Sequence, residues 1–292
     1  MSKKIGFIGL GVMGEPMCRN LAQKCGFLVM GFDLNDEPFA RLKSYGVERS
    51  EVVAIMAQCD VVFLSLPSGE VVHQLSHQPN GLLELARPGQ IVVDLSTSAV
   101  STTRELAAEF QKRGVKFADS PVARTRAAAE AGTLAVMVGA EQGTYDEICP
   151  LISTFATDIA LCGPVGCGQV VKILNNMVLF ETIVAFSEAK AIGERAGVDV
   201  EVLFNTLSKG SADSFALRNH GMKAVLPDNF PERAFSVQYA RKDLTYALML
   251  AEELHVNAKG ARTVEYWFDK AIEQGLGEKY HPVISKMIGG TK

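Results

Sequence analysis

The chain has 292 residues, of which 48% are hydrophobic, and its formal net charge at pH 7 is −4. A chain of this length exceeds the usual single domain, so we expect two domains with sizeable cores. The mild negative charge, without long runs of lysine or arginine, argues against nucleic acid or an anionic membrane as a partner. The N-terminal residues lack the apolar core of a signal peptide, and no uninterrupted apolar run approaches a membrane span.

The six cysteines are scattered along the sequence without C-x-x-C pairs. This pattern favours a cytoplasmic protein with reduced thiols over a disulfide-linked one. Cys162 and Cys167 flank a Gly-Pro turn, but no second pair or nearby histidine completes a zinc site. The five histidines have no metal-binding spacing either, so we expect no metal cofactor.

A glycine-rich turn follows a strand-like segment at 4–8 and precedes a segment of helical composition that ends near Gly26. In dinucleotide-binding units such a turn lets backbone amides approach a pyrophosphate at the helix N-terminus. The alternative is a glycine-rich turn without a ligand, but a second apolar stretch at 27–32 ends on an acid, as a dinucleotide site requires. The pattern therefore predicts that the cofactor contacts Gly9, Leu10, Gly11, Val12, Met13, Gly14 and Asp33.

The acid at the end of the second strand also bears on the choice of dinucleotide. A carboxylate at that position accepts hydrogen bonds from the ribose hydroxyls of NAD. A ribose 2′-phosphate would meet Asp33, with Asp36 and Glu37 close behind and no basic residue before Arg41. Because like charges at that range repel, the sequence favours NAD, and NADP is less likely.

Short apolar segments alternate with helical ones through residue 163. This alternation predicts an α/β fold with a Rossmann-type, doubly wound parallel sheet. Strand-like segments lie at 4–8, 27–32, 61–65, 91–94, 115–118, 134–138 and 158–161, and helices are expected up to residue 45 and at 102–113. We expect an NAD-binding domain over residues 1–163.

The pattern changes after residue 163. Residues 169–196 contain no proline and predict an unusually long helix that ends at Gly197. Further helical segments lie at 200–207, 213–225, 237–254 and 258–274, and convincing strands are absent. We therefore expect residues 164–292 to form an all-helical domain for the substrate and for oligomerisation, entered through the long helix.

Polar residues follow the third and fourth predicted strands. Because ligands bind beyond the C-terminal ends of parallel strands, Ser96 and Thr97 are placed to contact the nicotinamide half of the cofactor. Serine and threonine also commonly cap helices, so a capping role for both residues stays open at this point.

The long helix carries a polar stripe in apolar surroundings. Gly168, Lys172 and Asn176 are spaced by four and share one face of the helix. A lysine amid so much apolar surface loses ionisation free energy, so we expect its pKa to fall towards the range of an acid–base catalyst. Asn176 can orient the amine or the substrate. The alternative is a surface lysine beside a helix-packing glycine.

The whole chain resembles the β-hydroxyacid dehydrogenase family, which includes 3-hydroxyisobutyrate dehydrogenases, tartronate semialdehyde reductases and sulfolactaldehyde reductases. The resemblance rests on five motifs, at 8–14, 94–97, 131–134, 168–176 and 242–244. It implies that Lys172 and Asn176 are catalytic. It also implies that Leu66, Pro67, Thr97 and Lys242 touch the cofactor, and that the protein is a homodimer or homotetramer. We further expect Ser96 and Asn175 to contact the substrate.

One loop departs from the family pattern. The family usually has Pro-Val-Ser-Gly-Gly, whereas here Pro121 and Val122 are followed by Ala-Arg-Thr-Arg. The sulfolactaldehyde reductases resemble this chain in having Arg-Thr at that place. Because arginine binds a carboxylate or a sulfonate, we expect the substrate to contact Arg124, Thr125 and Arg126. The alternative is that one or both arginines point to solvent from a helix start, as the residues at 127–130 would allow.

The sequence therefore predicts an NAD-dependent oxidoreductase that interconverts a short β-hydroxy acid, or a sulfolactate-type sulfonate, with its semialdehyde. Sulfolactaldehyde and succinate semialdehyde remain open as substrates. Imine reductases resemble the chain in fold but usually lack the lysine, which makes them a weaker alternative. A non-catalytic NAD(H)-binding sensor is the alternative from another class, although a sensor needs neither Lys172 nor Asn176.

Overall fold

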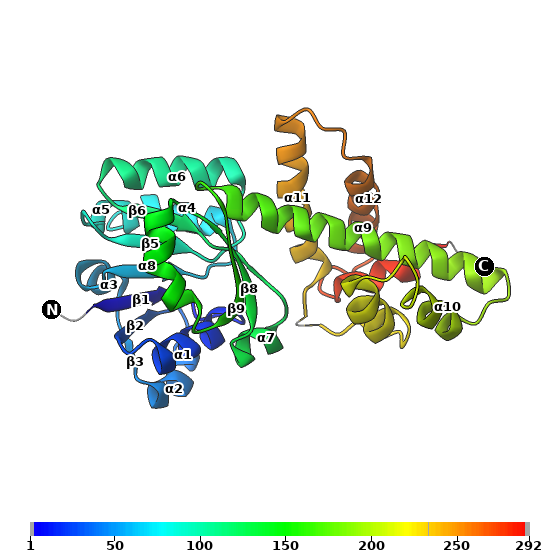
Figure 1. The fold of residues 1–292 in the computed structure, drawn as a ribbon, viewed down its shortest axis with the longest axis horizontal. Helices are drawn as coiled ribbons and strands as arrows, with labels where there is room; N and C mark the ends of the chain where they lie inside the picture. The colour runs from blue at the N-terminus through cyan, green and yellow to red at the C-terminus, as the bar shows by residue number, and fades with distance from the viewer. Residues whose placement is uncertain (1–2, 233, 290–292) are drawn as a thin grey trace. The chain divides into compact units, whose positions relative to one another are not determined.

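The computed structural model describes residues 3–232 and 234–289 (Figure 1). The chain divides into two compact units, Met1–Lys172 and Ile173–Lys292. The division falls inside the long helix α9 (Cys167–Arg195), whose first residues belong to the first unit.

The strands of the first unit form one sheet with the order β3-β2-β1-β4-β5-β6-β8-β7, and β9 pairs with β8. Their bounds are β1 (Lys4–Ile8), β2 (Leu28–Phe32), β3 (Val47–Arg49), β4 (Val61–Leu64), β5 (Ile91–Asp94), β6 (Lys116–Asp119), β7 (Val122–Ala123), β8 (Leu134–Gly139) and β9 (Ala156–Gly163). The order reverses at β1, with β2 on one side and β4 on the other, which places a ligand-binding crevice at the strand ends.

The expectation of a parallel sheet is confirmed for β1 to β6 and is wrong for β8. β8 runs antiparallel to both β6 and β7, and parallel to β9. The segment between β6 and β8 contains β7, which forms a short antiparallel pair with β8. The same connection contains the short helix α7 (Arg126–Ala131), and β8 returns in the direction opposite to β6.

Helices cover both faces of the sheet, as a doubly wound fold requires (Figure 1). They are α1 (Gly14–Lys24), α2 (Glu37–Leu42), η1 (Lys43–Tyr45), α3 (Val52–Gln58), α4 (Gly69–His77), α5 (Leu82–Leu85), α6 (Val100–Lys112), α7 (Arg126–Ala131) and α8 (Gln142–Ile152). One core cluster joins a face of the sheet to α1, α7 and α8, and includes Phe7, Phe63, Met17, Ala129 and Ile148. The other joins the opposite face to α3, α5 and α6, and includes Ile8, Val62, Ile55, Leu82 and Phe110.

The second unit is built from helices around its own core. Besides the rest of α9, it contains α10 (Val200–Leu207), the π-helical η2 (Leu217–Val225), α11 (Val237–Glu253), α12 (Lys259–Glu273) and the 3₁₀ segment η3 (His281–Lys286). Its core includes Phe180, Phe204, Leu244, Val264 and Phe268. Among the described residues, β pairing in this unit is limited to isolated bridges from Glu232 to Lys279 and from Ser236 to Tyr280.

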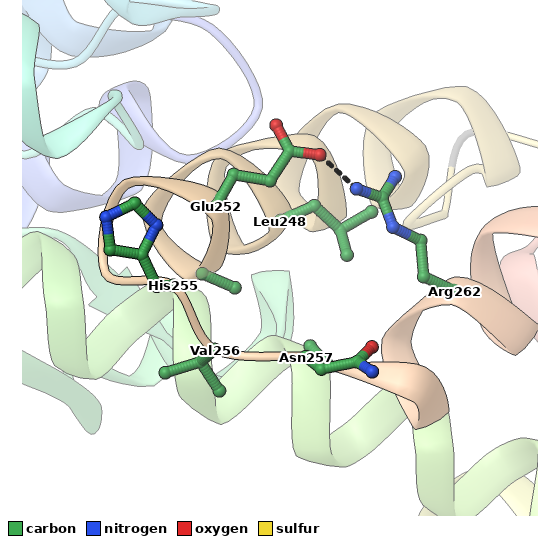
Figure 2. Close-up of a pocket in the computed structure, with 8 residues that line it drawn as sticks. Leu248, Glu252, His255, Val256, Asn257 and Arg262 are labelled. Atoms are coloured by element: carbon green, nitrogen blue, oxygen red, sulfur yellow. Dashed lines mark hydrogen bonds and ion pairs between the residues drawn. The ribbon is translucent and has the colours of Figure 1, made fainter.

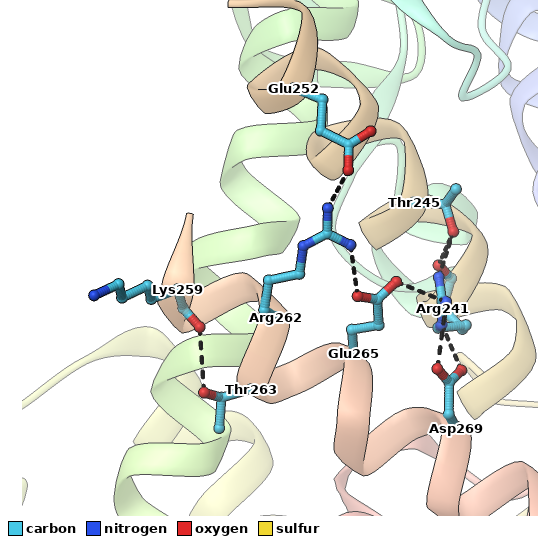
Figure 3. Close-up of polar contacts among 8 residues, drawn as sticks. All are labelled: Arg241, Thr245, Glu252, Lys259, Arg262, Thr263, Glu265 and Asp269. Atoms are coloured by element: carbon cyan, nitrogen blue, oxygen red, sulfur yellow. Dashed lines mark hydrogen bonds and ion pairs between the residues drawn. The ribbon is translucent and has the colours of Figure 1, made fainter. Parts of the chain in front are cut away.

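Ion pairs join α11 to α12 on the outside of this core (Figure 3). Arg241 donates from Nε to Asp269 at 2.7 Å and from Nη2 to Glu265 at 2.8 Å. Arg262 lies between Glu252 of α11 and Glu265 of its own helix. The network fixes the two helices side by side through charges rather than through further apolar contacts.

The long helix α9 is apolar over much of its length. By length and composition it is the helix among the described residues that could cross a membrane. Core helices of globular proteins pass the same test, and the buried polar residues of α9 are Gln169, Lys172, Asn176 and Ser187. The prediction of an unusually long helix in this part of the chain is confirmed.

Candidate active site

The glycine-rich turn after β1 uses each of its glycines differently. Gly9 has a φ of 97°, and a Cβ on it would lie 2.2 Å from the backbone oxygen of Ser65. A Cβ on Gly14 would lie 2.0 Å from the backbone oxygen of Gly9, so this glycine permits close packing of the turn. A Cβ on Gly11 would meet nothing within 4 Å. No protein atom explains Gly11, which therefore has the property expected where a ligand approaches the backbone.

The start of α1 is suited to an anion. The N-cap residue Met13 offers no side-chain hydrogen bond, and Val12 beside it is 60% exposed. Within α1, Glu15 N donates to Gly11 O and Pro16 has no N–H, so a phosphate would meet the N–H groups of the turn that precedes them, where the helix dipole also favours an anion. Residues 9–14 therefore fit the pyrophosphate of a dinucleotide.

Asp33 contacts this turn directly. Its Oδ2 accepts a hydrogen bond from the backbone N–H of Leu10 at 2.6 Å, and its Oδ1 accepts one from Asn35 at 2.8 Å. The carboxylate thus connects the end of β2 to the glycine-rich turn. The sequence suggested a contact with ribose and gave no sign of this second role.

A pocket of about 460 Å³ opens beside the turn. Gly11 and Val12 lie on its wall together with the start of α2, where Asp36 and Glu37 are found. Two cations, Arg41 and Arg126, also line it.

The end of β5 carries a buried polar cluster. Asp94 is 1% exposed and accepts hydrogen bonds from Ser96 N at 2.9 Å and from Ser98 Oγ at 3.3 Å. Burial raises the pKa of Asp94 to about 6, against the hydrogen bonds from both serines, which lower it. Ser96 Oγ in turn accepts from the backbone N–H of Leu66 at 2.9 Å. The cluster joins the loop after β5 to the loop after β4.

The N-cap of α6 is Ala99, so neither Ser96 nor Thr97 caps that helix. Of the two roles left open for them, helix capping is wrong. Ser96 positions Leu66, and Thr97 is partly buried beside it in the chain. Pro67, the next predicted cofactor contact, is exposed.

A second buried acid, Asp119, holds the start of α9. Its Oδ1 accepts from Gly166 N at 2.7 Å, and its Oδ2 accepts from Gln169 N at 2.8 Å. Burial raises the pKa of Asp119 to about 6, although the backbone N–H groups that it accepts from lower it. Asp119 thus caps α9 from the end of β6, fifty residues earlier in the chain.

The first turn of α9 places Lys172. Gly168 packs against Asp119 and β8: a Cβ on it would lie 2.4 Å from the backbone oxygen of Met137 and 2.8 Å from that of Asp119. Lys172, one turn later, is 8% exposed. The close partner of Gly168 is thus protein backbone, as expected of a helix-packing glycine.

In the second unit, Asn176 and Lys242 meet at a buried acid. Asn176 Nδ2 donates to Asp243 Oδ2 at 2.8 Å, and the exposed Asn175 donates to Asn176 Oδ1 at 3.1 Å. Asp243 is 1% exposed, and its Oδ1 lies 3.4 Å from Lys242 Nζ. That ammonium also lies 3.9 Å from the ring centroid of Tyr239, a cation–π distance.

The two arginines of the unusual loop diverge. Arg124 has a φ of 85° and reaches β9, where its Nη2 lies 2.6 Å from Asp158. Arg126 pairs with Glu130 on its own helix at 2.9 Å. Thr125 lies between them and caps α7 by accepting from Ala128 N at 3.4 Å. The structure therefore does not place these three side chains in one cluster.

A separate pocket of about 250 Å³ lies at the junction of α11 and α12 (Figure 2). Glu252, His255, Asn257 and Arg262 line it. None of the predicted site residues does, and its arginine is already paired with Glu252.

Four site residues escaped the sequence analysis: Asp94, Asp119, Gln169 and Asp243. Asp94 ends a predicted strand, and Asp243 stands inside the motif from which only Lys242 was assigned. Both positions were therefore visible. Gln169 likewise stands inside the motif at 168–176. Asp119 gave no signal, because its role depends on contacts with Gly166 and Gln169, far along the chain.

Comparison with protein families matches both parts of the chain. Residues 4–163 match the NAD binding domain of 6-phosphogluconate dehydrogenase, and residues 166–288 match the NAD-binding domain of NADP-dependent 3-hydroxyisobutyrate dehydrogenase. The chain belongs to the β-hydroxyacid dehydrogenase family. It is accordingly an oxidoreductase of small hydroxy acids with a nicotinamide-dinucleotide-binding domain, as the sequence predicted.

Full-length relatives support this assignment. The chain is 32% identical to 2-(hydroxymethyl)glutarate dehydrogenase of Eubacterium barkeri, over 98% of this chain and 95% of the relative. It is 29% identical to 2-hydroxy-3-oxopropionate reductase of Escherichia coli K12, over 98% and 97% of the two chains. A solved structure of Mycobacterium tuberculosis 3-hydroxyisobutyrate dehydrogenase with L-serine is similar with a TM-score of 0.89, 29% identity and 99% coverage of both chains.

The glycine turn yields a test with a matched pair of variants. Gly11→Ala adds a methyl group where no protein atom lies, so its unfolding free energy should be close to that of the wild type. Its Kd for NADH, measured by fluorescence titration, should rise about tenfold or more, which corresponds to about 1.4 kcal/mol or more. Gly14→Ala should instead lower the unfolding free energy by about 1–3 kcal/mol, because the methyl group meets backbone. Unchanged NADH binding by Gly11→Ala would show that the turn does not hold the cofactor.

Proposed function

We propose that this protein is an NAD-dependent dehydrogenase that interconverts a short β-hydroxy acid, or its sulfonate counterpart, with the semialdehyde. The observation that carries the proposal is Lys172, a lysine 8% exposed on a helix whose first turn is fixed by buried hydrogen bonds. Burying a cation costs free energy, and buried titratable groups are common at functional sites. The burial of Lys172 therefore favours a catalytic role over a surface one.

In this proposal Lys172 is the general acid and base. During reduction its ammonium donates a proton to the carbonyl oxygen of the semialdehyde, and during oxidation its amine takes the proton from the hydroxyl group. The nicotinamide, when bound, supplies or accepts the hydride. Asn176 is held by Asp243 with its amide in a fixed direction, which supports an orienting role towards the reacting group.

The substrate's acid group is proposed to bind Arg124. This residue takes a left-handed backbone conformation that an arginine rarely adopts, and its ion pair with Asp158 has side-chain exposures of 38% and 61%. Pairs this exposed contribute little, so an incoming carboxylate or sulfonate could replace Asp158 at modest cost. Related enzymes are named for 2-(hydroxymethyl)glutarate and 2-hydroxy-3-oxopropionate, both of which are small acids.

NAD is proposed as the cofactor on the strength of the acids around the pocket. Asp33 ends β2, and Asp36 and Glu37 line the pocket with Arg41. Arg41 uses both Nε and Nη2 on the two carboxylate oxygens of Glu15, which leaves it poorly placed for a ribose phosphate. NADP is the alternative, because the family matched by residues 166–288 is described as NADP-dependent.

We also propose a cytoplasmic homo-oligomer, a dimer or a tetramer. All six cysteines are free, which suits a reducing compartment. In the second unit, large apolar side chains are exposed on α9 and α10, among them Ile192 at 69% and Val202 at 60%. Surfaces of this kind support self-association.

Replacing the proposed catalytic lysine should separate chemistry from cofactor binding. Lys172→Ala should lower kcat by about 10²–10⁴, the usual contribution of a general acid–base group, and leave the Kd for NADH within a few-fold. Lys190→Ala on the same helix removes only an exposed ion pair with Glu194 and should keep normal turnover. A near-normal kcat in Lys172→Ala would contradict the assignment of Lys172 as the general acid and base.

The cofactor assignment can be tested by moving charge at the end of β2. The wild type should have a higher kcat/KM with NADH than with NADPH, because the 2′-phosphate meets a carboxylate. Asp33→Ser combined with Leu34→Arg should reduce or reverse the preference, since Leu34 is 91% exposed and has room for a longer side chain. Glu147→Gln, which removes an exposed carboxylate that is paired with Lys116 and does not line the pocket beside the glycine-rich turn, should leave the preference unchanged. Equal kcat/KM for both cofactors in the wild type would refute the proposal.

The substrate anchor can be tested without straining the backbone. Glycine adopts the φ of 85° at position 124 freely, so Arg124→Gly should leave the fold intact. The KM for an acidic semialdehyde should rise about tenfold or more, as the loss of a charged hydrogen bond of about 1.5–3 kcal/mol implies. Arg113→Ala, at the exposed end of α6, serves as the control. An unchanged KM, or equal activity on an uncharged aldehyde of the same length, would show that Arg124 serves the surface.

A further inference from the structure

The side chains of Arg126 and Arg124 point to different parts of the first unit. It lines the pocket of about 460 Å³ together with Gly11 and Val12 of the glycine-rich turn. Arg124, two residues earlier, points instead to Thr133, Thr157 and Asp158 at the edge of the sheet. The loop therefore directs one cation towards each of two places.

The position of Arg126 relative to the turn is fixed by a buried contact between α1 and α7. Asn20 of α1 is 5% exposed, and its Nδ2 donates to Pro16 O and to Ala129 O at 3.0 Å each. Arg19 Nη2 also donates to Glu130 O at 2.9 Å. These bonds attach the backbone of α7 to α1. They keep the side chain of Arg126, at the start of α7, within reach of the start of α1.

The two cations of the pocket differ in how firmly they are held. Arg41 forms a bidentate pair with Glu15, at 2.6 Å and 2.8 Å. Arg126 contacts Glu130 one turn along its own helix, and among the described residues this pair uses only Nε. The Arg126 and Glu130 side chains are 64% and 47% exposed, so their pair contributes little to stability. Arg126 is therefore the cation that can leave its carboxylate partner and bind a ligand.

The charges around the pocket favour such a cation. Its acids are Glu15, Asp36 and Glu37, and its cations are Arg41 and Arg126. Glu15 is paired with Arg41, and Asp36 is paired with Arg49, which leaves the carboxylate of Glu37 on the rim. Arg126 is the arginine of the pocket that can offset this charge and the two charges of a pyrophosphate over Gly11.

We propose that Arg126 is a cofactor-binding residue, which leaves Glu130 and donates hydrogen bonds from its guanidinium to the pyrophosphate of the bound dinucleotide. The guanidinium matches phosphate oxygens in geometry, and its charge adds to that of the α1 N-terminus. Glu130 is the resting partner that the pyrophosphate displaces. The inference requires only dinucleotide binding and does not depend on the proposed substrate or on Lys172.

The test is equilibrium binding of NADH, NADPH and ADP-ribose, with no turnover involved. Arg126→Gln should raise the Kd of all three about tenfold, because all three contain the pyrophosphate. Glu130→Gln should leave these Kd values unchanged or lower them by a few-fold, since it removes the competitor. Arg126→Lys should recover part of the loss. Arg113→Ala, at the exposed end of α6, should bind as the wild type does.

Three results would overturn the proposal. The first is an unchanged Kd in Arg126→Gln. The second is a loss confined to NADPH, which would place the arginine at the ribose phosphate. The third is the first result combined with a raised KM for the aldehyde at saturating NADH, which would make Arg126 a substrate contact. Thermal unfolding of each variant confirms that the comparison is made on folded protein.

Discussion

The carboxylate of Asp119 is the constraint on which the rest of the first unit depends. It accepts hydrogen bonds from the backbone of Gly166 and Gln169 and so holds the first turn of α9 at the end of β6. Room for it is made by glycines: a Cβ on Gly139 would lie 2.3 Å from its Oδ1, and one on Gly168 would lie 2.8 Å from its Oδ2. The direction in which α9 leaves the sheet, and hence the place of Lys172, follows from this contact.

The same turn is attached to the cofactor side of the sheet. Gln169 is fully buried, donates from Nε2 to Ser96 O at 2.8 Å and accepts from Ser98 N at 3.1 Å. Ser96 in turn holds Leu66 after β4. Burial of Asp94 and Asp119 raises the pKa of each to about 6, a cost that hydrogen bonds from neighbouring residues offset in part. A rigid polar layer thus fixes the proposed catalytic helix relative to the proposed cofactor loops.

Most of the fold could be predicted from local sequence patterns. The glycine turn, the buried strands and the long helix are each visible over fewer than about thirty residues, where periodicity and turn residues suffice. The strand β8 was predicted, but its antiparallel direction was not, because strand pairing joins distant segments. The three-residue β3 is too short for a pattern to show, and the predicted helix at 213–225 is π-helical over Leu217–Val225. The candidate lysine Lys172 and the glycines at 9–14 could likewise be identified from the sequence. The partners of Asp33 and the divergence of Arg124 and Arg126 required coordinates, because contacts across the fold decide them.

The most direct test of this account is the oxidation of NADH, followed by absorbance, during incubation with methylmalonate, tartronate and succinate semialdehydes and sulfolactaldehyde side by side. The account predicts turnover of at least one of these short anionic aldehydes, and little with an uncharged aldehyde of similar length. Tight NADH binding without turnover of any of them would contradict it, and would favour a protein that senses the dinucleotide rather than one that uses it.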